Sequence, residues 1–178
     1  MAVEVVDRLG PDALTLKAIA DAAGVRPPSL YNHVDGLEDV RLGLRLRAYE
    51  FIAVRQHAAT EGLPPRAWLR ALARAHRTFA LEHPGLYAAM QPTVHTPDVD
   101  PELRRAAEAV LDQLITAVAA LGTTGDDAVH AVRALRSAVL GFITLEIAGD
   151  FGMPQDIDQS FEQLIEVLER GIAGREQT

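Results

Sequence analysis

The sequence is poor in the residues that build disulfides, thiolate metal sites and strands. It contains no cysteine, and aromatic residues make up only 5% of its 178 residues. Without cysteine, disulfide bridges and cysteine-ligated metals are excluded. Aromatic side chains favour strands, whereas alanine and leucine, which supply much of the 48% hydrophobic content, favour helices. We therefore predict an all-α fold of about nine helices.

Two further absences concern membranes and export. No uninterrupted apolar run approaches the roughly 20 residues that a bilayer-spanning helix needs. No basic segment followed by an apolar stretch and a cleavage site opens the chain. We therefore predict a cytoplasmic protein without a membrane partner.

The residue patterns of enzymes and metal sites are also missing. No serine lies in a nucleophile elbow, and there is no glycine-rich phosphate loop. His76 and His83 are spaced to share a helix face, but no carboxylate lies at ligand spacing beside them. We predict no enzymatic activity, no catalytic residue, no cofactor and no metal.

Acidic residues outnumber basic ones. The net charge of −8 excludes a protein that binds DNA through bulk positive charge. Residues 1–50 contain six Lys and Arg side chains and eight Asp and Glu, a balance of 6 − 8 = −2. Any binding to nucleic acid must therefore rely on a local patch.

The stretch Thr15–Val34 predicts two short helices joined by a turn. Thr15 is a good N-cap, and apolar residues follow it at helical spacing. Gly24 can end that helix in the left-handed conformation. The pair Pro27–Pro28 fits only the first turn of a second helix, which we expect to end near His33. Together these elements describe a helix-turn-helix.

The second of these helices carries polar side chains that a core helix would not need. Leu30 and Val34 are spaced to anchor it inward. A solvated polar face is the plain alternative, but the threonine cap, the glycine turn and the Tyr-x-His ending occur together here. The donors long enough to reach phosphates or base edges are Arg26, Ser29, Tyr31, Asn32 and His33.

In this combination the segment resembles the DNA-binding motif of the TetR family of transcriptional repressors. The likeness extends over Ala2–Arg47 and implies a DNA-binding domain at residues 1–47, followed by a helical ligand-binding and dimerisation domain at residues 48–178. It also implies DNA contacts. Those to base edges would come from Arg26, Pro27 and Ser29, those to phosphates from Tyr31 and His33, either kind from Asn32, and those to the backbone from Thr15 and Lys17.

Two positions depart from the family pattern. The first helix begins at Met1 without the basic arm that members usually carry, so we expect an N-terminal truncation or an upstream start. Leu37 stands where members commonly have a lysine that contacts a phosphate. Each lost phosphate contact weakens binding and flattens its salt dependence.

Helical spacing of apolar residues continues through the rest of the chain. The last two helices, expected over 127–150 and 156–173, are similar to the family's dimerisation helices, although a monomeric core would show the same pattern. The run Ala138–Glu146 is similar to a subgroup with a WHG-type C-terminal domain, with Leu140 in place of its His. The resemblance implies a homodimer with an interface at Leu135, Val139, Ile143, Phe161, Leu164 and Leu168.

Aromatic and polar residues between Trp68 and Phe142 suggest a small-molecule pocket. Each of them, taken singly, is equally consistent with ordinary packing. We expect an apolar or amphipathic effector. The candidate lining residues are Trp68, His76, Phe79, Tyr87, Met90, His95, Leu111, Phe142 and Glu146.

Two functional hypotheses follow. The first is a homodimeric, ligand-responsive repressor that binds a palindromic double-stranded operator and is released by a small molecule. Its half-sites would lie about 34 Å apart or a multiple of that. The second is a helical ligand-binding or interaction module that no longer binds DNA, which the acidity, the missing arm and Leu37 favour. An all-α enzyme has no residue cluster behind it.

Overall fold

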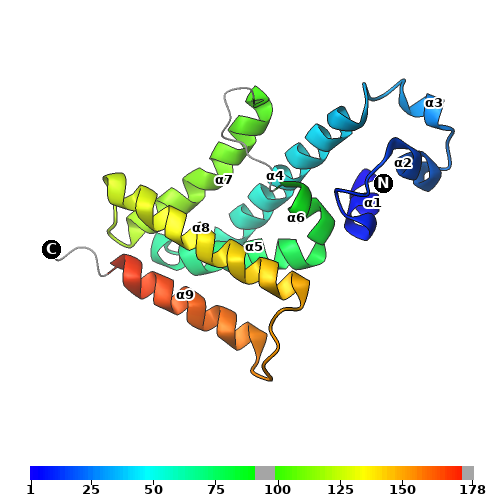
Figure 1. Cartoon of the computed structure of the whole chain (residues 1–178). Coiled ribbons are helices and arrows are strands. Elements are labelled where there is room, and N and C mark those ends of the chain that lie inside the picture. The colour runs from blue at the N-terminus through cyan, green and yellow to red at the C-terminus, as the bar shows by residue number, and fades with distance from the viewer. Residues whose placement is uncertain (91–98, 174–178) are drawn as a thin grey trace.

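The computed structural model describes residues 1–90 and 99–173 of the chain. Over these ranges it contains nine α-helices, one short 3-10 turn and no strand (Figure 1). The predicted all-α fold is therefore confirmed. The elements are α1 (Ala2–Leu9), α2 (Leu16–Ala23), α3 (Pro27–Leu30), α4 (Leu37–Thr60), η1 (Pro65–Ala67), α5 (Trp68–Glu82), α6 (Pro84–Met90), α7 (Pro101–Ala120), α8 (Gly125–Ala148) and α9 (Ile157–Ala173).

Helix α4 runs through the middle of the molecule and joins its two ends (Figure 1). Helices α1–α3 lie near its N-terminal end, and α5, α6 and α7 pack along it. Its buried side includes Val40, Leu44 and Ile52. The boundary predicted between residues 47 and 48 falls inside this helix. Helix α4 therefore connects the two predicted domains without a linker.

The start of α6 is docked directly against α1. Gly85 has no side chain, and a Cβ at this position would lie 1.9 Å from the carbonyl oxygen of Val6. One carboxylate oxygen of Asp7 accepts a hydrogen bond from the N–H of Leu86 (2.8 Å), and the other lies 2.8 Å from Nδ1 of His83. Helix α1 is therefore held to the C-terminal helices by backbone contact as well as through α4.

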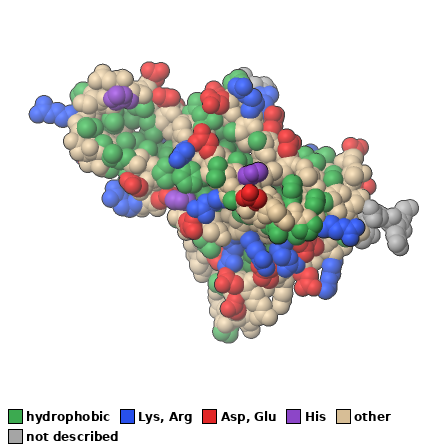
Figure 2. Space-filling view, turned by 180° about the vertical axis from the view of Figure 1, so that it is seen from behind, with side chains coloured by type: hydrophobic (Ala, Val, Ile, Leu, Met, Phe, Trp, Pro, Cys, Tyr) green, Lys and Arg blue, Asp and Glu red, His purple; other side chains and the backbone are tan. Residues whose placement is uncertain are grey.

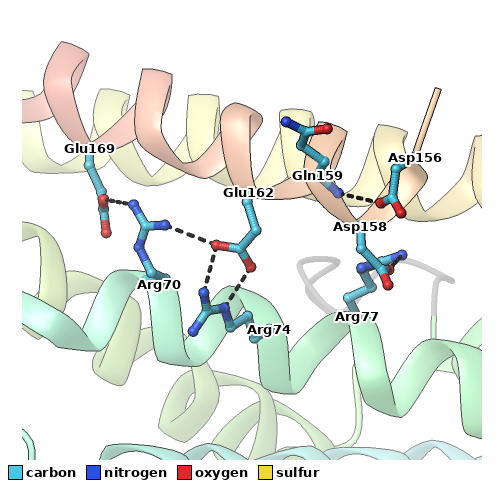
Figure 3. Close-up of polar contacts among 8 residues, drawn as sticks. All are labelled: Arg70, Arg74, Arg77, Asp156, Asp158, Gln159, Glu162 and Glu169. Atoms are coloured by element: carbon cyan, nitrogen blue, oxygen red, sulfur yellow. Dashed lines mark hydrogen bonds and ion pairs between the residues drawn. The ribbon is translucent and has the colours of Figure 1, made fainter.

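Helix α9 runs antiparallel to α8 and is held on α5 by a row of ion pairs, which we call the α5–α9 ladder (Figures 1 and 3). Three arginines project toward α9 from one side of α5. The pairs are Arg70 with Glu162 and Glu169, Arg74 with Glu162, and Arg77 with Asp158 of α9 and Glu146 of α8.

Four of the side chains predicted to form a dimer interface are instead buried within the single chain. Helix α8 packs on α5 and α7, and α9 packs on α8, so these side chains have no surface left for a partner. The other two, Leu164 and Leu168, are half-buried. The prediction is corrected for Leu135, Val139, Ile143 and Phe161, which are 2%, 5%, 0% and 1% exposed.

Helix α8 is long and apolar enough, by length and composition, to cross a bilayer. Arg133 and Arg136 interrupt the apolar residues of α8, so no uninterrupted apolar run indicated this property. One such helix is weak evidence for a membrane span, because a helix that packs on several sides has the same composition. Three large apolar side chains of α8 are each more than 40% exposed, namely Val129, Leu145 and Ile147.

Candidate nucleic-acid interface and effector site

Helix α2 begins and ends at the residues predicted. The hydroxyl of Thr15 accepts a hydrogen bond from the N–H of Ala18 (3.1 Å). Gly24 adopts the left-handed conformation (φ 64°, ψ 26°), and the N–H of Val25 donates to the carbonyl of Ala20 (3.0 Å). These bonds satisfy backbone groups at both ends of a helix of only two turns. Local sequence therefore sets where the chain leaves α2 and enters α3.

Helix α3 is shorter than predicted. It begins at Pro27, as the lack of an N–H donor requires, but it ends at Leu30 rather than near His33. Residues 31–33 continue as a turn, in which the N–H groups of His33 (2.8 Å) and Val34 (3.0 Å) donate to the carbonyl of Leu30. The prolines therefore set where α3 begins, and the turn at residues 31–33 sets where it ends.

The residues predicted to contact DNA all lie on the surface at this end of the molecule. Tyr31 is 60% exposed. Leu30 and Val34 are partly buried and pack against the core, as predicted for inward anchors. The polar side of the segment is therefore presented outward. The eight exposed residues are Thr15, Lys17, Arg26, Pro27, Ser29, Tyr31, Asn32 and His33.

Positive charge on this segment is sparse. The amine of Lys17 lies 2.9 Å from Asp21, whose hydrogen bond raises the pKa of Lys17. Arg26 is exposed and forms no ion pair within the described residues. Figure 2 shows the Lys and Arg side chains scattered over this end rather than gathered. An interface here would be a local patch.

Several of the predicted pocket residues gather between α5 and α6. The rings of His76 and Tyr87 meet edge to face with centroids 5.6 Å apart, and those of Phe79 and Tyr87 are 6.4 Å apart. Phe79, Tyr87 and Met90 are buried. Met90 follows Tyr87 by three residues on α6 and so lies close to it. We call these four residues the α5–α6 cluster.

Two other predicted pocket residues have different partners. Phe142 packs against the rings of Phe151 and Phe161, with centroids 4.8 Å and 5.1 Å away. Glu146 accepts two hydrogen bonds from the guanidinium of Arg77. These contacts assign Phe142 and Glu146 to the packing of α8 and α9 on α5.

The three remaining predicted pocket residues are Trp68, Leu111 and His95. Trp68 lies at the start of α5, where its indole N–H donates to the carbonyl of Leu63 (3.1 Å). Leu111 on α7 is partly buried against the core. His95 lies outside the described residues.

The comparisons with known proteins agree with this architecture. A family model described as the C-terminal domain of tetracyclin repressor-like proteins matches residues 69–168. An uncharacterized HTH-type transcriptional regulator of Mycobacterium tuberculosis is 33% identical over 174 residues, covering 98% of this chain and 79% of the relative. The chain belongs to the TetR family of transcriptional regulators.

Further similarities support this TetR-family membership. A second HTH-type regulator, from Bacillus subtilis, is 33% identical over 177 residues, covering 96% of this chain and 88% of the relative. A solved structure from Rhodococcus has the same fold, with a TM-score of 0.80, 23% identity and coverage of 96% of this chain and 90% of that chain. The TetR resemblance is therefore confirmed. The WHG-type subgroup stays a prediction.

Two polar residues of α4 that were not among the predicted site residues, Arg45 and Gln56, also have buried polar atoms. Gln56 is 0% exposed. Among the described residues, neither amide atom of Gln56 has a hydrogen-bond partner, and the same holds for Nε of Arg45 and Nε2 of His76. Buried polar groups are almost always satisfied, so a group of unpaired ones indicates a place for a polar ligand or ordered water. The sequence feature that could have predicted the burial of Gln56 is its position on the apolar face of α4, one turn beyond Ile52.

The environment of His76 predicts a loss of stability in acid. Burial and, to a smaller extent, the positive charge of Arg136 together lower the pKa of His76 to about 4. The unfolded chain, with an ordinary histidine pKa of about 6.5, therefore binds a proton more readily than the folded chain. The stabilisation from neutral His76 is complete above about pH 6.5 and decreases as the pH drops toward 4. The decrease is at most about 3 kcal/mol, because the residue as a whole is only half-buried.

Urea unfolding at pH 7.5 and pH 4.5 measures this effect in the wild-type chain and in His76→Gln. The wild type should lose more stability between the two pH values than the variant, which has no group titrating at that position. An equal loss in both would show that His76 does not cause the acid sensitivity.

Proposed function

We propose that this TetR-family chain is a homodimeric, ligand-responsive repressor that acts in the cytoplasm, binds a palindromic operator and is released from it by a small molecule. The observation that carries the proposal is the outward side of α2 and α3. Its eight candidate residues are exposed, while Leu30 and Val34 hold the segment against the core. A short helix presented in this way fits the major groove of a duplex.

The candidate DNA contacts divide by chemistry. In this proposal, polar and rigid residues at the start of α3 meet base edges, and the turn after α3 binds phosphate oxygens. The first group is Arg26, Pro27 and Ser29, the second is Tyr31 and His33, and Asn32 belongs to either.

Helix α2 would add contacts to the DNA backbone. The hydroxyl oxygen of Thr15 accepts a hydrogen bond from Ala18, and its own proton remains free to be donated to a phosphate. Lys17 would exchange its pair with Asp21 for a phosphate. This exchange is easy because ion pairs between exposed side chains are held weakly.

The proposed dimer face is the exposed side of α8 and α9. Ala134 and Gly141 share this side of α8, and Val167 of α9 is 66% exposed. Small residues let helices approach closely, and the apolar composition of α8 suits a helix that packs on a second chain as well as on its own. Leu164 and Leu168 remain candidates at the edge of this face. Two chains related by a two-fold axis would then present two copies of α3 to the two half-sites.

Small-molecule release is suggested by solved structures of the same fold. They include a TetR variant from Acinetobacter baumannii in complex with minocycline and FadR from Bacillus subtilis in complex with stearoyl-CoA, each with a TM-score of 0.72 at 24% and 17% identity. In this chain, the α5–α6 cluster and Gln56 are the proposed effector site. Both α4 and α6 reach the DNA-binding end, so a ligand that prefers one arrangement of these helices would change the distance between half-sites.

A gel-shift of the full chain with DNA from upstream of its own gene tests the function. Tyr31→Ala should weaken binding at least tenfold, because a hydrogen bond to a charged group contributes about 1.5–3 kcal/mol and the dimer has two copies. The melting temperature should not change, since Tyr31 is 60% exposed. The shifted complex should contain two protein chains.

Two variants sharpen this experiment. Tyr31→Phe keeps the ring and removes the hydroxyl, so it should lose as much affinity as Tyr31→Ala if the hydroxyl binds phosphate. His57→Ala changes an exposed residue at the other end of α4 and should bind DNA like the wild type. A wild-type chain that gives no shift at low salt would overturn the proposal.

A helical ligand-binding module without DNA binding is the second candidate function. The pairing of Lys17, Arg41 and Arg47 with neighbouring carboxylates favours it, because these pairs leave little free positive charge near α3. The gel-shift separates the two functions. A folded, ligand-binding chain that gives no shift would support the module.

A further inference from the structure

Buried polar groups with no partner extend along one side of α4 and continue onto α5. Arg45, Tyr49, Ile52 and Gln56 follow one another at intervals of three or four residues and so share a face of α4. At a rise of 1.5 Å per residue, Arg45 and Gln56 are about 16 Å apart along the helix. Nε of Arg45, both amide atoms of Gln56 and Nε2 of His76 on α5 have no hydrogen-bond partner within the described residues.

The charge on this side of α4 is positive and unbalanced. Arg45 on α4 and Arg136 on α8 both lie close enough to the buried Tyr49 to act on its hydroxyl electrostatically, and Arg136 acts on His76 as well. Within residues 1–90 and 99–173, neither arginine forms an ion pair with a carboxylate.

The buried and half-buried carboxylates nearest these two arginines are already bound by other arginines. The unpaired carboxylates of α7 and α8 are exposed to solvent, namely Glu102, Glu108, Asp112, Asp126 and Asp127. Glu146 of α8 is bound by Arg77, and Glu82 of α5 is paired with Arg55. Glu50 of α4 is exposed and paired with Arg47. His76 itself is neutral near pH 7 because its pKa is lowered to about 4. The partly buried Arg45 and the exposed Arg136 therefore place two positive charges beside this side of α4, and neither forms an ion pair within the described residues. This arrangement disfavours a cationic ligand and favours an anionic one.

We propose that the effector is an apolar organic acid whose carboxylate binds between Arg45 and Arg136 and whose body lies along α4 toward Gln56, His76 and the α5–α6 cluster. The inference rests on the proposed ligand-responsive function and names the chemical class of the ligand. A carboxylate supplies the acceptor oxygens that guanidinium groups require. Ile52, Phe79 and Met90 are 0%, 0% and 7% exposed and provide apolar surface for the body.

The position of this site also provides a way for ligand binding to change DNA binding. Arg45 lies on the half of α4 nearest α1–α3, whereas Arg136 lies on α8, the helix of the proposed dimer face. A carboxylate that binds both would draw these two helices together. Such a ligand would therefore favour one spacing of the two DNA-binding ends over another.

Ligand binding to the full chain without DNA tests this inference. The probes are decanoate and 2-naphthoate, each compared with its matched alcohol and amine at concentrations below micelle formation. Binding is measured by thermal shift and by calorimetry. At least one acid should raise the melting temperature and bind at least tenfold more tightly than its alcohol, and the amines should bind least.

Arginine variants locate the carboxylate. Arg136→Gln and Arg45→Gln should each weaken binding of the acid at least tenfold, whereas Arg133→Gln, an exposed arginine one turn away on α8, should not change it. Arg136 is exposed, so its variant remains informative if Arg45→Gln fails to fold.

Equal or tighter binding of the alcohols or amines would overturn the inference, and so would acid binding that neither arginine variant weakens. Binding by none of the probes, with the operator gel-shift intact, would also overturn it and would leave the repressor function standing. Acid binding by a chain that never shifts DNA would reject the repressor function instead.

Discussion

Gly85→Ala is expected to destabilise the protein by about 3 kcal/mol or more, since overpacking against backbone is among the costliest substitutions. The added Cβ would lie 1.9 Å and 2.4 Å from the carbonyl oxygen and carbon of Val6, and 2.6 Å from Cα of Asp7. All three are backbone atoms, so no side chain can rotate away. Relief requires α6 to separate from α1, which would also break the hydrogen bond from Leu86 to Asp7.

Urea unfolding of Gly85→Ala against the wild type measures this loss. Gly43→Ala is the matched control, because a Cβ at Gly43 in α4 meets nothing within 4 Å. Replacing a glycine inside a helix by alanine should stabilise the chain by about 0.5–1 kcal/mol. We also expect Gly85→Ala to lose operator binding, because α1 would no longer be held against α6. A Gly85→Ala chain as stable as the wild type would show that α6 is not docked on α1 as described.

Arg77→Met is expected to cost about 3–5 kcal/mol, because it leaves a buried carboxylate without its partner. The side chains of Arg77 and Glu146 are only 13% and 11% exposed. Arg77 also binds Asp158, and its guanidinium lies 4.9 Å from the centre of the Phe161 ring. These carboxylates hold the pKa of Arg77 above its ordinary range, so the guanidinium stays charged throughout the accessible pH range.

Thermal and urea unfolding of three variants separate the buried pair from its exposed neighbours. Arg74→Met removes an arginine that is 56% exposed and should cost no more than about 1 kcal/mol. The double variant Arg77→Met with Glu146→Leu should recover much of the stability lost in Arg77→Met, because no unpaired charge remains buried. A double variant no more stable than Arg77→Met would mean that apolar packing, rather than the charge on Glu146, causes the loss.

Signals that act within a few residues allowed much of the fold to be predicted. The cap at Thr15, the left-handed Gly24 and the prolines that begin α3 all act through backbone groups one to four residues away. Such groups meet in the same way whatever the rest of the chain does. For the same reason, the exposed side of α2 and α3 was predicted well.

Contacts between distant segments could not be predicted. Asp7 and His83 are 76 residues apart, and nothing near either residue indicates the pairing. Helix α8 is apolar on several sides, so its sequence did not show which side faces its own core. That ambiguity caused Leu135, Val139 and Ile143 to be assigned to a partner chain. Gln56 was missed because an isolated polar residue on an apolar stripe is recognisable only once its surroundings are known.

The pair of prolines at the start of α3 affects the conformational entropy that would be lost when the chain binds an operator. Both rings hold their backbone torsions near one value before any DNA arrives. A flexible DNA-binding segment loses conformational entropy when it binds DNA. In α3, much of that entropy is already lost when the chain folds. Because there is little positive charge near α3, this rigidity would contribute more to the affinity for DNA than it would in a strongly basic protein. In a strongly basic protein, charge alone could supply the affinity.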